Sequence, residues 1–294
     1  MEFRLIGETA VLAADGTPLD LGPPKQRVIL GVLMLRAGQT TGHEQLVDAL
    51  WPHTADQRAT LSTVQAYVCR LRRVLEPDAV RRGTYQILTR RPEGYRLAIR
   101  QESLDVGRVR ILAREGRRLL TAGDSAGAAA ELRRALAEWR GEPLDGLPDR
   151  PWIRDEAHYL AELRTALTED AAEAELAQGL GPVLAPELAR LLAAHPLRER
   201  LRALTAHAFY QAGRQTEALA LIAEGRRRLA EDFGLDLGPG LRLMEERILR
   251  HDPALTLRTS VSLLGPARPA ARHPMPYRTA PKRSRPAGRT TPAR

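Results

Sequence analysis

The most constraining feature of the sequence is a run of regularly spaced apolar residues between positions 58 and 75. Leu61, Val64, Val68, Leu71 and Leu75 follow one another at intervals of three, four, three and four residues. This spacing predicts an amphipathic helix with a narrow face turned toward a core. Rotation about the helix axis places small and basic residues on the opposite side: Thr63, Ala66, Tyr67, Arg70 and Arg73, flanked by Ser62, Gln65, Cys69 and Arg72.

The residues before this helix predict short strands and two further helices. Apolar residues separated by glycine and turn signals predict strands within residues 3–21. A helix is predicted for residues 24–38, because proline suits the first helical turn and glycine suits the end of a helix. Thr41 and Glu44 then form a predicted capping box at the start of a short helix, which ends at Trp51.

A β-hairpin is predicted after the amphipathic helix. Its strands cover residues 85–89 and 95–99, and residues 90–94 form its tip. Strands, three helices and a hairpin in this order are typical of a winged helix-turn-helix. The sequence therefore predicts a winged helix-turn-helix domain at residues 1–100.

Positive charge is concentrated where this helix and this hairpin lie. The chain has a net charge of +9, and residues 58–100 hold ten arginines against three acidic residues, a balance of +7. Such a stretch within a structured segment is a candidate phosphate-binding surface, with a solvated basic face as the alternative. Because the charge, the helix and the hairpin coincide, DNA binding is favoured.

The side-chain types on the helix match the requirements of a major groove. Thr63, Ala66 and Cys69 are small enough to let the helix axis approach base edges, and neighbouring arginines reach phosphates or a guanine edge. Arginines at the hairpin tip would enter an adjacent minor groove. The candidate DNA-binding residues are Ser62, Thr63, Gln65, Ala66, Tyr67, Cys69, Arg70, Arg72, Arg73, Arg90 and Arg91.

Residues 101–252 are predicted to form a second domain made entirely of helices. A turn containing glycine precedes an Ala- and Leu-rich helix at Gly123, Gly179 and Gly213. Gly179 and Gly213 are separated by the 34-residue period of tetratricopeptide helix pairs. The expected architecture is a stack of helix pairs, so the chain is mainly α with a small β component.

Residues 253–294 form a basic tail rich in proline and arginine. They contain nine basic residues and no acidic ones, and seven prolines occur between 266 and 292. Such a segment buries too little surface to offset the entropy of ordering, so disorder is predicted from about residue 266. Two functions are open for the tail. It adds sequence-independent attraction to DNA through its positive charge, or it is an extension without function, and the second alternative is favoured.

The remaining signals argue against an enzyme, a metal protein or a membrane protein. The single cysteine cannot form an internal disulfide, and no apolar run is long enough to cross a bilayer, so a cytoplasmic, nucleoid-associated protein is expected. The histidines lack metal-ligand spacing. The acidic pairs Asp155-Glu156 and Glu245-Glu246 are interpreted as solvated helix faces with salt bridges inside each helix, and Trp139 as a packing residue. No catalytic residue, metal or cofactor is predicted.

Several segments together resemble the Streptomyces antibiotic regulatory protein (SARP) family. They are residues 3–7, 22–27, 64–72 and 94–97, with Leu46-Val47-Asp48-Ala49-Leu50-Trp51, His195-Pro196-Leu197-Arg198-Glu199-Arg200-Leu201, and residues 210–217 and 229–240. The resemblance covers about residues 1–252. It implies an OmpR-type winged helix followed by a tetratricopeptide-like bacterial transcriptional activator domain.

The resemblance also implies a function and roles for particular residues. Members of the family activate secondary-metabolite gene clusters by binding direct repeats near the −35 region and recruiting RNA polymerase holoenzyme through its sigma factor. Self-association on double-stranded DNA is therefore expected. Thr63, Ala66 and Arg70 would face the groove, whereas Ser62, Tyr67, Arg72 and Arg73 would contact the backbone and Arg91 would lie on the wing. Cys69 replaces the family's usual serine, which puts the preferred bases in doubt. The alternative function is a helical-repeat adaptor whose winged module binds protein.

Overall fold

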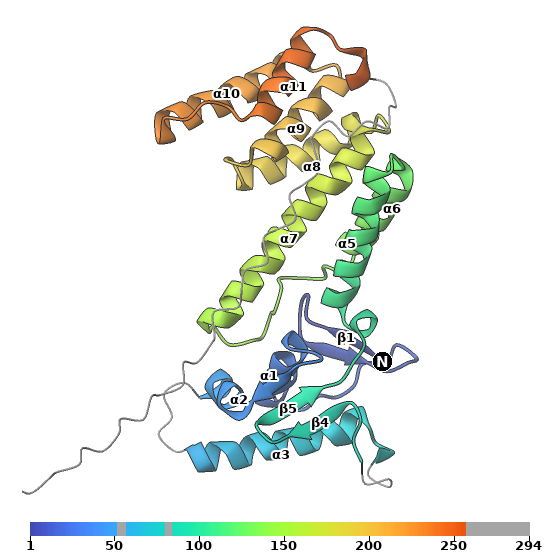
Figure 1. Cartoon of the computed structure of the whole chain (residues 1–294), viewed down its shortest axis with the longest axis vertical. Helices are drawn as coiled ribbons and strands as arrows, with labels where there is room; N and C mark the ends of the chain where they lie inside the picture. The colour runs from blue at the N-terminus through green and yellow to red at the C-terminus, as the bar shows by residue number, and fades with distance from the viewer. Residues whose placement is uncertain (52–56, 80–83, 257–294) are drawn as a thin grey trace, which may run out of the picture. The chain divides into compact units, whose positions relative to one another are not determined.

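The computed structural model describes residues 1–51, 57–79 and 84–256 (Figure 1). The N-terminal elements are β1 (Glu2–Arg4), β2 (Ala10–Leu12), α1 (Pro24–Leu35), β3 (Thr40–Gly42), α2 (His43–Leu50), α3 (Gln57–Leu75), β4 (Leu88–Arg91) and β5 (Gly94–Leu97). The helical part comprises η1 (Gln101–Ser103), α5 (Asp105–Thr121), α6 (Ser125–Leu136), α7 (Pro151–Leu176), α8 (Gly181–Ala194), α9 (Glu199–Gln211), α10 (Gln215–Phe233), α11 (Pro239–Leu249) and η2 (Pro253–Leu255). The expected fold class, mainly α with small sheets, is confirmed. The disorder expected from about residue 266 lies outside the described residues.

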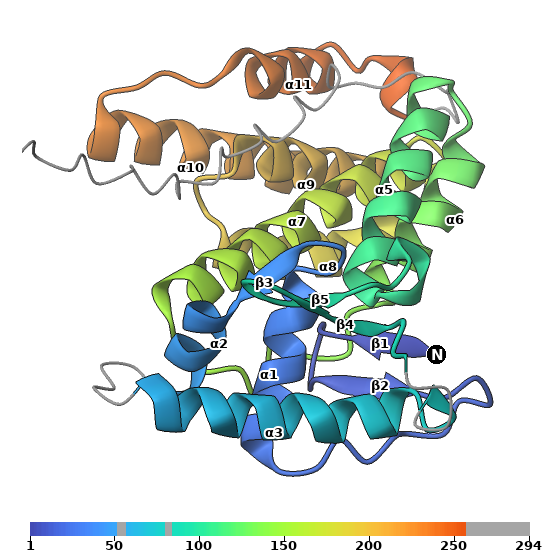
Figure 2. The ribbon, with the colours of Figure 1, turned by 60° about the horizontal axis from the view of Figure 1, so that its bottom comes forward.

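Two small antiparallel sheets occur among the described residues of the N-terminal region. In the first sheet β1 pairs with β2, with Phe3 opposite Val11. The second sheet has the order β3-β5-β4, so the hairpin of β4 and β5 gains a third strand from the segment just before α2. Figure 2 shows α3 passing in front of α1, with β4 and β5 above α3 in the view.

The expected capping box at Thr41 is wrong by one residue. Thr41 belongs to β3, where it pairs with Tyr95, and Gly42 is the N-cap of α2. The Gly42 N–H donates to the side-chain oxygen of Gln45 over 3.4 Å, so Gln45 takes the part expected of Glu44. Strand pairing keeps Thr41 extended and moves the start of the helix one residue later.

The strands of the hairpin are shorter at its base than expected and extend further toward its tip. β4 begins at Leu88 rather than at residue 85, and β5 ends at Leu97 rather than at residue 99. Arg90 and Arg91 lie within β4, with Arg91 opposite Gly94. The tip therefore reduces to the two residues between β4 and β5.

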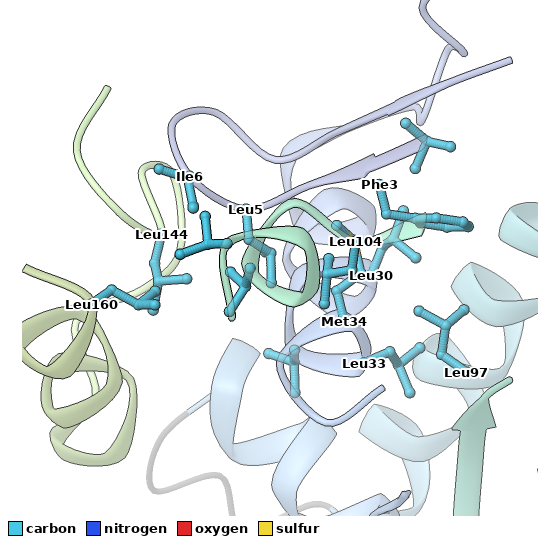
Figure 3. Packing of buried hydrophobic residues seen from close by; sticks show 14 of the residues in the cluster. Phe3, Leu5, Ile6, Leu30, Leu33, Met34, Leu97, Leu104, Leu144 and Leu160 are labelled. Carbon is cyan, nitrogen blue, oxygen red and sulfur yellow. The ribbon is translucent and has the colours of Figure 1, made fainter. Parts of the chain in front are cut away.

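The core of the N-terminal region continues into the helical region. Phe3, Leu30 and Leu97 pack in one buried cluster with residues of α5, α6 and α7, including Leu160 (Figure 3). This buried cluster therefore includes residues on both sides of residue 100. A second buried cluster joins the end of α7 to α8, α9, α10, α11 and η2.

Helix pairs follow one another through the turns that the sequence indicated. Gly123, Gly179 and Gly213 have φ values of 82°, 79° and 74°, which glycine adopts without steric cost. Each of them lies between two helices. The expectation that residues 101–252 consist entirely of helices is wrong at residues 137–150, which form an irregular segment between α6 and α7. We call this segment the strap.

The acidic pairs form salt bridges between neighbouring helices as well as the expected one within a helix. Glu156 on α7 lies 3.5 Å from Arg110 on α5, and Glu245 on α11 bonds Arg226 on α10. These two bridges join neighbouring helices, whereas Glu246 pairs over 2.7 Å with Arg250, four residues further along at the end of the same helix, as expected. Burial raises the pKa of Glu156. Trp139 is buried in the first cluster, which confirms its interpretation as a packing residue.

We expect a buried histidine to make stability fall in acid. His207 is 2 % exposed, its Nε2 lies 2.9 Å from the carbonyl oxygen of Leu255, and burial lowers its pKa to about 4. The unfolded state, with the ordinary pKa of 6.5, binds more protons between these values. The free energy of unfolding should therefore decrease as pH falls from 6.5 toward 4. Denaturant titrations across this window check it, and a His207→Gln variant with an identical pH dependence would contradict it.

Candidate nucleic-acid interface

One side of α3 is anchored in the core as its apolar spacing indicates. Val64, Val68, Leu71 and Leu75 are at most 1 % exposed, and Leu61 is partly buried. The helix packs against α1 and α2. This packing fixes the rotation of α3 about its own axis, and hence which residues face solvent.

The candidate site residues divide into an exposed group and a half-buried group. Thr63, Tyr67 and Arg72 are half-buried. The exposed group contains Ser62, Gln65, Ala66, Cys69, Arg70, Arg73, Arg90 and Arg91. We call the solvent side of α3, from Ser62 to Arg73, the recognition face.

On the recognition face, the guanidinium group of Arg70 lies over the aromatic ring of Tyr67. The guanidinium carbon of Arg70 lies 6.0 Å from the centre of the Tyr67 ring. Tyr67 in turn packs against the first core cluster. The ring therefore supports an exposed arginine, whose permanent charge and planar donors suit phosphate or a guanine edge.

Arg72 is engaged with the hairpin. Its Nε donates to the carbonyl oxygen of Leu88 over 2.7 Å, and its guanidinium carbon lies 5.1 Å from the Tyr85 ring and 5.6 Å from the Tyr95 ring. The structure thus gives Arg72 an intramolecular role. Its expected contact with the DNA backbone stays a prediction.

Sequence reasoning missed Glu76, the residue after the end of α3. Its carboxylate accepts the backbone N–H groups of Gln86 and Ile87 over 2.7 and 2.8 Å. A negative charge at a helix C-terminus is unfavourable because the helix dipole also places partial negative charge there. The position of Glu76 directly after an arginine-rich helix therefore indicated that another group stabilises this carboxylate.

The described residues contain neither a candidate metal-binding cluster nor a candidate membrane-spanning helix. Within residues 1–51, 57–79 and 84–256, no three His, Cys, Asp or Glu side chains gather as a metal-binding group. No helix in those ranges is both long and apolar enough to cross a bilayer.

An exposed helix face with small and basic residues, held beside a hairpin that carries two exposed arginines, defines a winged-helix DNA-binding protein. The stacked helix pairs that follow it add a second module. The class of protein that this architecture defines is a DNA-binding regulator.

Comparisons with known proteins identify the family. Residues 16–97 match the family described as transcriptional regulatory protein, C terminal, and residues 104–249 match the bacterial transcriptional activator domain. The chain is 40% identical over 260 residues to the regulatory protein AfsR of Streptomyces coelicolor, covering 86% of this chain and 25% of AfsR. It is 31% identical over 258 residues to the regulatory protein DnrI of Streptomyces peucetius, covering 87% of this chain and 94% of DnrI.

A solved structure has the same fold. EmbR of Mycobacterium tuberculosis, in complex with a low-affinity phosphopeptide, is 35% identical and superposes with a TM-score of 0.77 over 86% of this chain and 66% of EmbR. The chain belongs to the SARP family of transcriptional regulators, which is not a family of enzymes. It spans a quarter of the length of the AfsR proteins that it matches.

Proposed function

We propose that the chain activates a secondary-metabolite gene cluster by binding direct repeats near the promoter −35 region. The observation that carries the proposal is the recognition face of α3, whose exposed residues beside Arg90 and Arg91 include Ala66, Cys69, Arg70 and Arg73. Direct repeats place at least two copies side by side, and the helical module would contact the neighbouring copy and the sigma factor of RNA polymerase. This activity places the protein in the cytoplasm, on the nucleoid.

A footprint on the promoters of the neighbouring gene cluster tests this function. We expect protection of two sites repeated in the same orientation, and promoter-dependent transcription with purified holoenzyme that increases when the chain is added. A chain that protects no promoter but retains protein partners would support the adaptor function instead.

The substitution Arg70→Ala is expected to relax specificity at one base pair. If Arg70 reads a base edge, discrimination at that position should fall by about 1–3 kcal/mol. Competition binding against duplexes varied one position at a time measures the change. Arg73→Ala is the matched control on the same helix: as a phosphate contact it should weaken binding on all sequences alike and lower the salt slope by about one. An equal loss from Arg70→Ala on random DNA would contradict the assignment.

A further inference from the structure

The last turn of α3 and the residue that follows the helix hold the start of the hairpin through two side chains of opposite charge. Arg72 donates from Nε to the Leu88 carbonyl oxygen over 2.7 Å. Glu76 accepts from Gln86 through Oε1 over 2.7 Å and from Ile87 through Oε2 over 2.8 Å. The two side chains thus engage consecutive residues of the segment that leads into β4.

These contacts lie at the base of the hairpin, where β4 begins at Leu88. The N–H groups of Gln86, Ile87 and Leu88 all donate to the carboxylate of Glu76, over 2.7, 2.8 and 3.4 Å. Hydrogen bonds to an ionised acceptor are shorter and stronger than neutral ones, and they offset the unfavourable position of Glu76 at the end of a helix. The Ile87 carbonyl still accepts the N–H of Ala98 over 2.7 Å, so this residue links α3 to the residue that follows β5.

Arg72 extends the attachment to both sides of the hairpin. Its guanidinium lies within 5.6 Å of the ring centres of Tyr85, which precedes β4, and of Tyr95 in β5. Cation–π contacts of a half-buried arginine with two rings restrict how the hairpin can pivot on α3.

The attachment point is close to the exposed wing arginines. Arg90 and Arg91 follow Leu88 by two and three residues, about 7–10 Å along an extended strand. The strand between them is paired with β5 throughout, with Leu88 opposite Leu97 and Arg91 opposite Gly94. A shift at Leu88 therefore moves both arginines.

We propose that Arg72 and Glu76 form a clamp that sets the position of Arg90 and Arg91 relative to the recognition face. Glu76 is then a positioning residue for DNA binding, since it acts through the wing without itself contacting the duplex. The proposal rests on the proposed function, because it assumes that the wing arginines reach DNA.

A double-mutant cycle in the full chain tests the clamp. With the clamp intact, Arg91→Ala should lower the slope of log affinity against log salt by about one. In a Glu76→Ala background the same substitution should change the slope by close to zero, because the arginine is no longer held at its phosphate. Arg70→Ala should keep its base-specific penalty in both backgrounds. A general loss of stability would weaken all variants alike and would not remove the Arg91 contribution selectively.

Amide exchange in the free protein tests the contacts themselves. Glu76→Ala should speed exchange at Gln86 and Ile87 while the amides of β1 and β2 keep their protection. If Glu76→Ala does not fold, Glu76→Gln takes its place, since it keeps one accepting oxygen and should reduce the Arg91 contribution only in part.

The outcomes separate the clamp from the proposed function. An Arg91→Ala effect of the same size in both backgrounds overturns the clamp while the DNA-binding function stands. A wild-type chain that shows no salt-dependent binding to its promoter overturns the proposed function, and the positioning role with it. An unchanged exchange rate at Gln86 and Ile87 overturns the clamp whether or not the chain binds DNA.

Discussion

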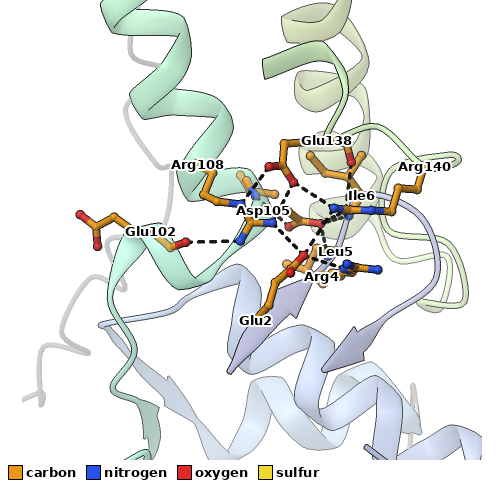
Figure 4. A network of polar contacts seen from close by, with 10 residues as sticks. Glu2, Arg4, Leu5, Ile6, Glu102, Asp105, Arg108, Glu138 and Arg140 are labelled. Atoms are coloured by element: carbon orange, nitrogen blue, oxygen red, sulfur yellow. Dashed lines mark hydrogen bonds and ion pairs between the residues drawn. The ribbon is translucent and has the colours of Figure 1, made fainter. Parts of the chain in front are cut away.

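Asp105→Ala is expected to lower the free energy of unfolding by about 2–6 kcal/mol. Oδ2 of this fully buried carboxylate accepts the N–H groups of Leu5 and Ile6 over 2.8 and 2.9 Å, and Oδ1 accepts that of Val106 (Figure 4). Alanine leaves the Leu5 and Ile6 donors buried without their acceptor, and each costs about 1–3 kcal/mol. Denaturant unfolding monitored by circular dichroism measures the loss.

Asp15 provides the matched control for this prediction. Asp15 also accepts a backbone N–H, that of Thr17 over 3.0 Å, but on the exposed surface. Water replaces the carboxylate there, so Asp15→Ala should change stability by no more than about 0.5 kcal/mol. Equal losses in the two alanine variants would show that burial of the Leu5 and Ile6 amides is not what gives Asp105 its importance.

Burial also determines how Asp105 responds to pH. It raises the pKa of this carboxyl above 3.8, although three N–H groups and Arg108 act in the opposite direction. The folded state then holds the proton more tightly than the unfolded state. The stability that Asp105 contributes should therefore be greatest below pH 3.8 and decline as pH rises through its folded pKa.

The contacts of Asp105 belong to a broader attachment between the N-terminal and helical regions. The strap adds backbone hydrogen bonds to the segment after β1. The Gly7 N–H donates to the carbonyl oxygen of Glu142 over 3.1 Å, and the Leu144 N–H donates to that of Leu5 over 2.9 Å. Arg150 at the end of the strap donates to the carbonyl oxygen of Asp48 in α2 over 3.0 Å. The winged-helix region is thus fixed to the helical module through its first sheet and through α2.

The sequence was sufficient to predict the elements whose buried residues recur at regular intervals along the chain. The stripe of α3 is an example, because its four fully buried residues recur every three or four positions and no distant residue is needed to recognise them. The turns at Gly123, Gly179 and Gly213 are another, because glycine at a positive φ marks a helix end by itself.

Elements that depend on distant partners were not predictable in the same way. β3 has three residues, and it is a strand only because β5 lies beside it. The strap has no repeating pattern, and its conformation follows from contacts with Leu5, Gly7 and α2. Within the candidate site, the exposed residues of α3 followed from the helix periodicity. The roles of Arg72 and Glu76 did not, since both depend on where β4 begins.

Gly94→Ala is expected to destabilise the protein by about 3 kcal/mol or more, at the upper end of the range for overpacking, because the obstruction is backbone. A Cβ at Gly94 would lie 1.9 Å from the carbonyl oxygen of Thr41, which forces β5 away from β3. Gly42, directly opposite in the register, is the matched control: its Cβ would meet only the Glu93 carbonyl oxygen at 3.9 Å, an ordinary contact. Thermal unfolding of the two variants gives the comparison, and promoter binding should fail first in Gly94→Ala, since the displaced strand carries the hairpin. Two variants of equal stability would mean that separating β3 from β5 costs little free energy, and that β3 does not hold the hairpin in place.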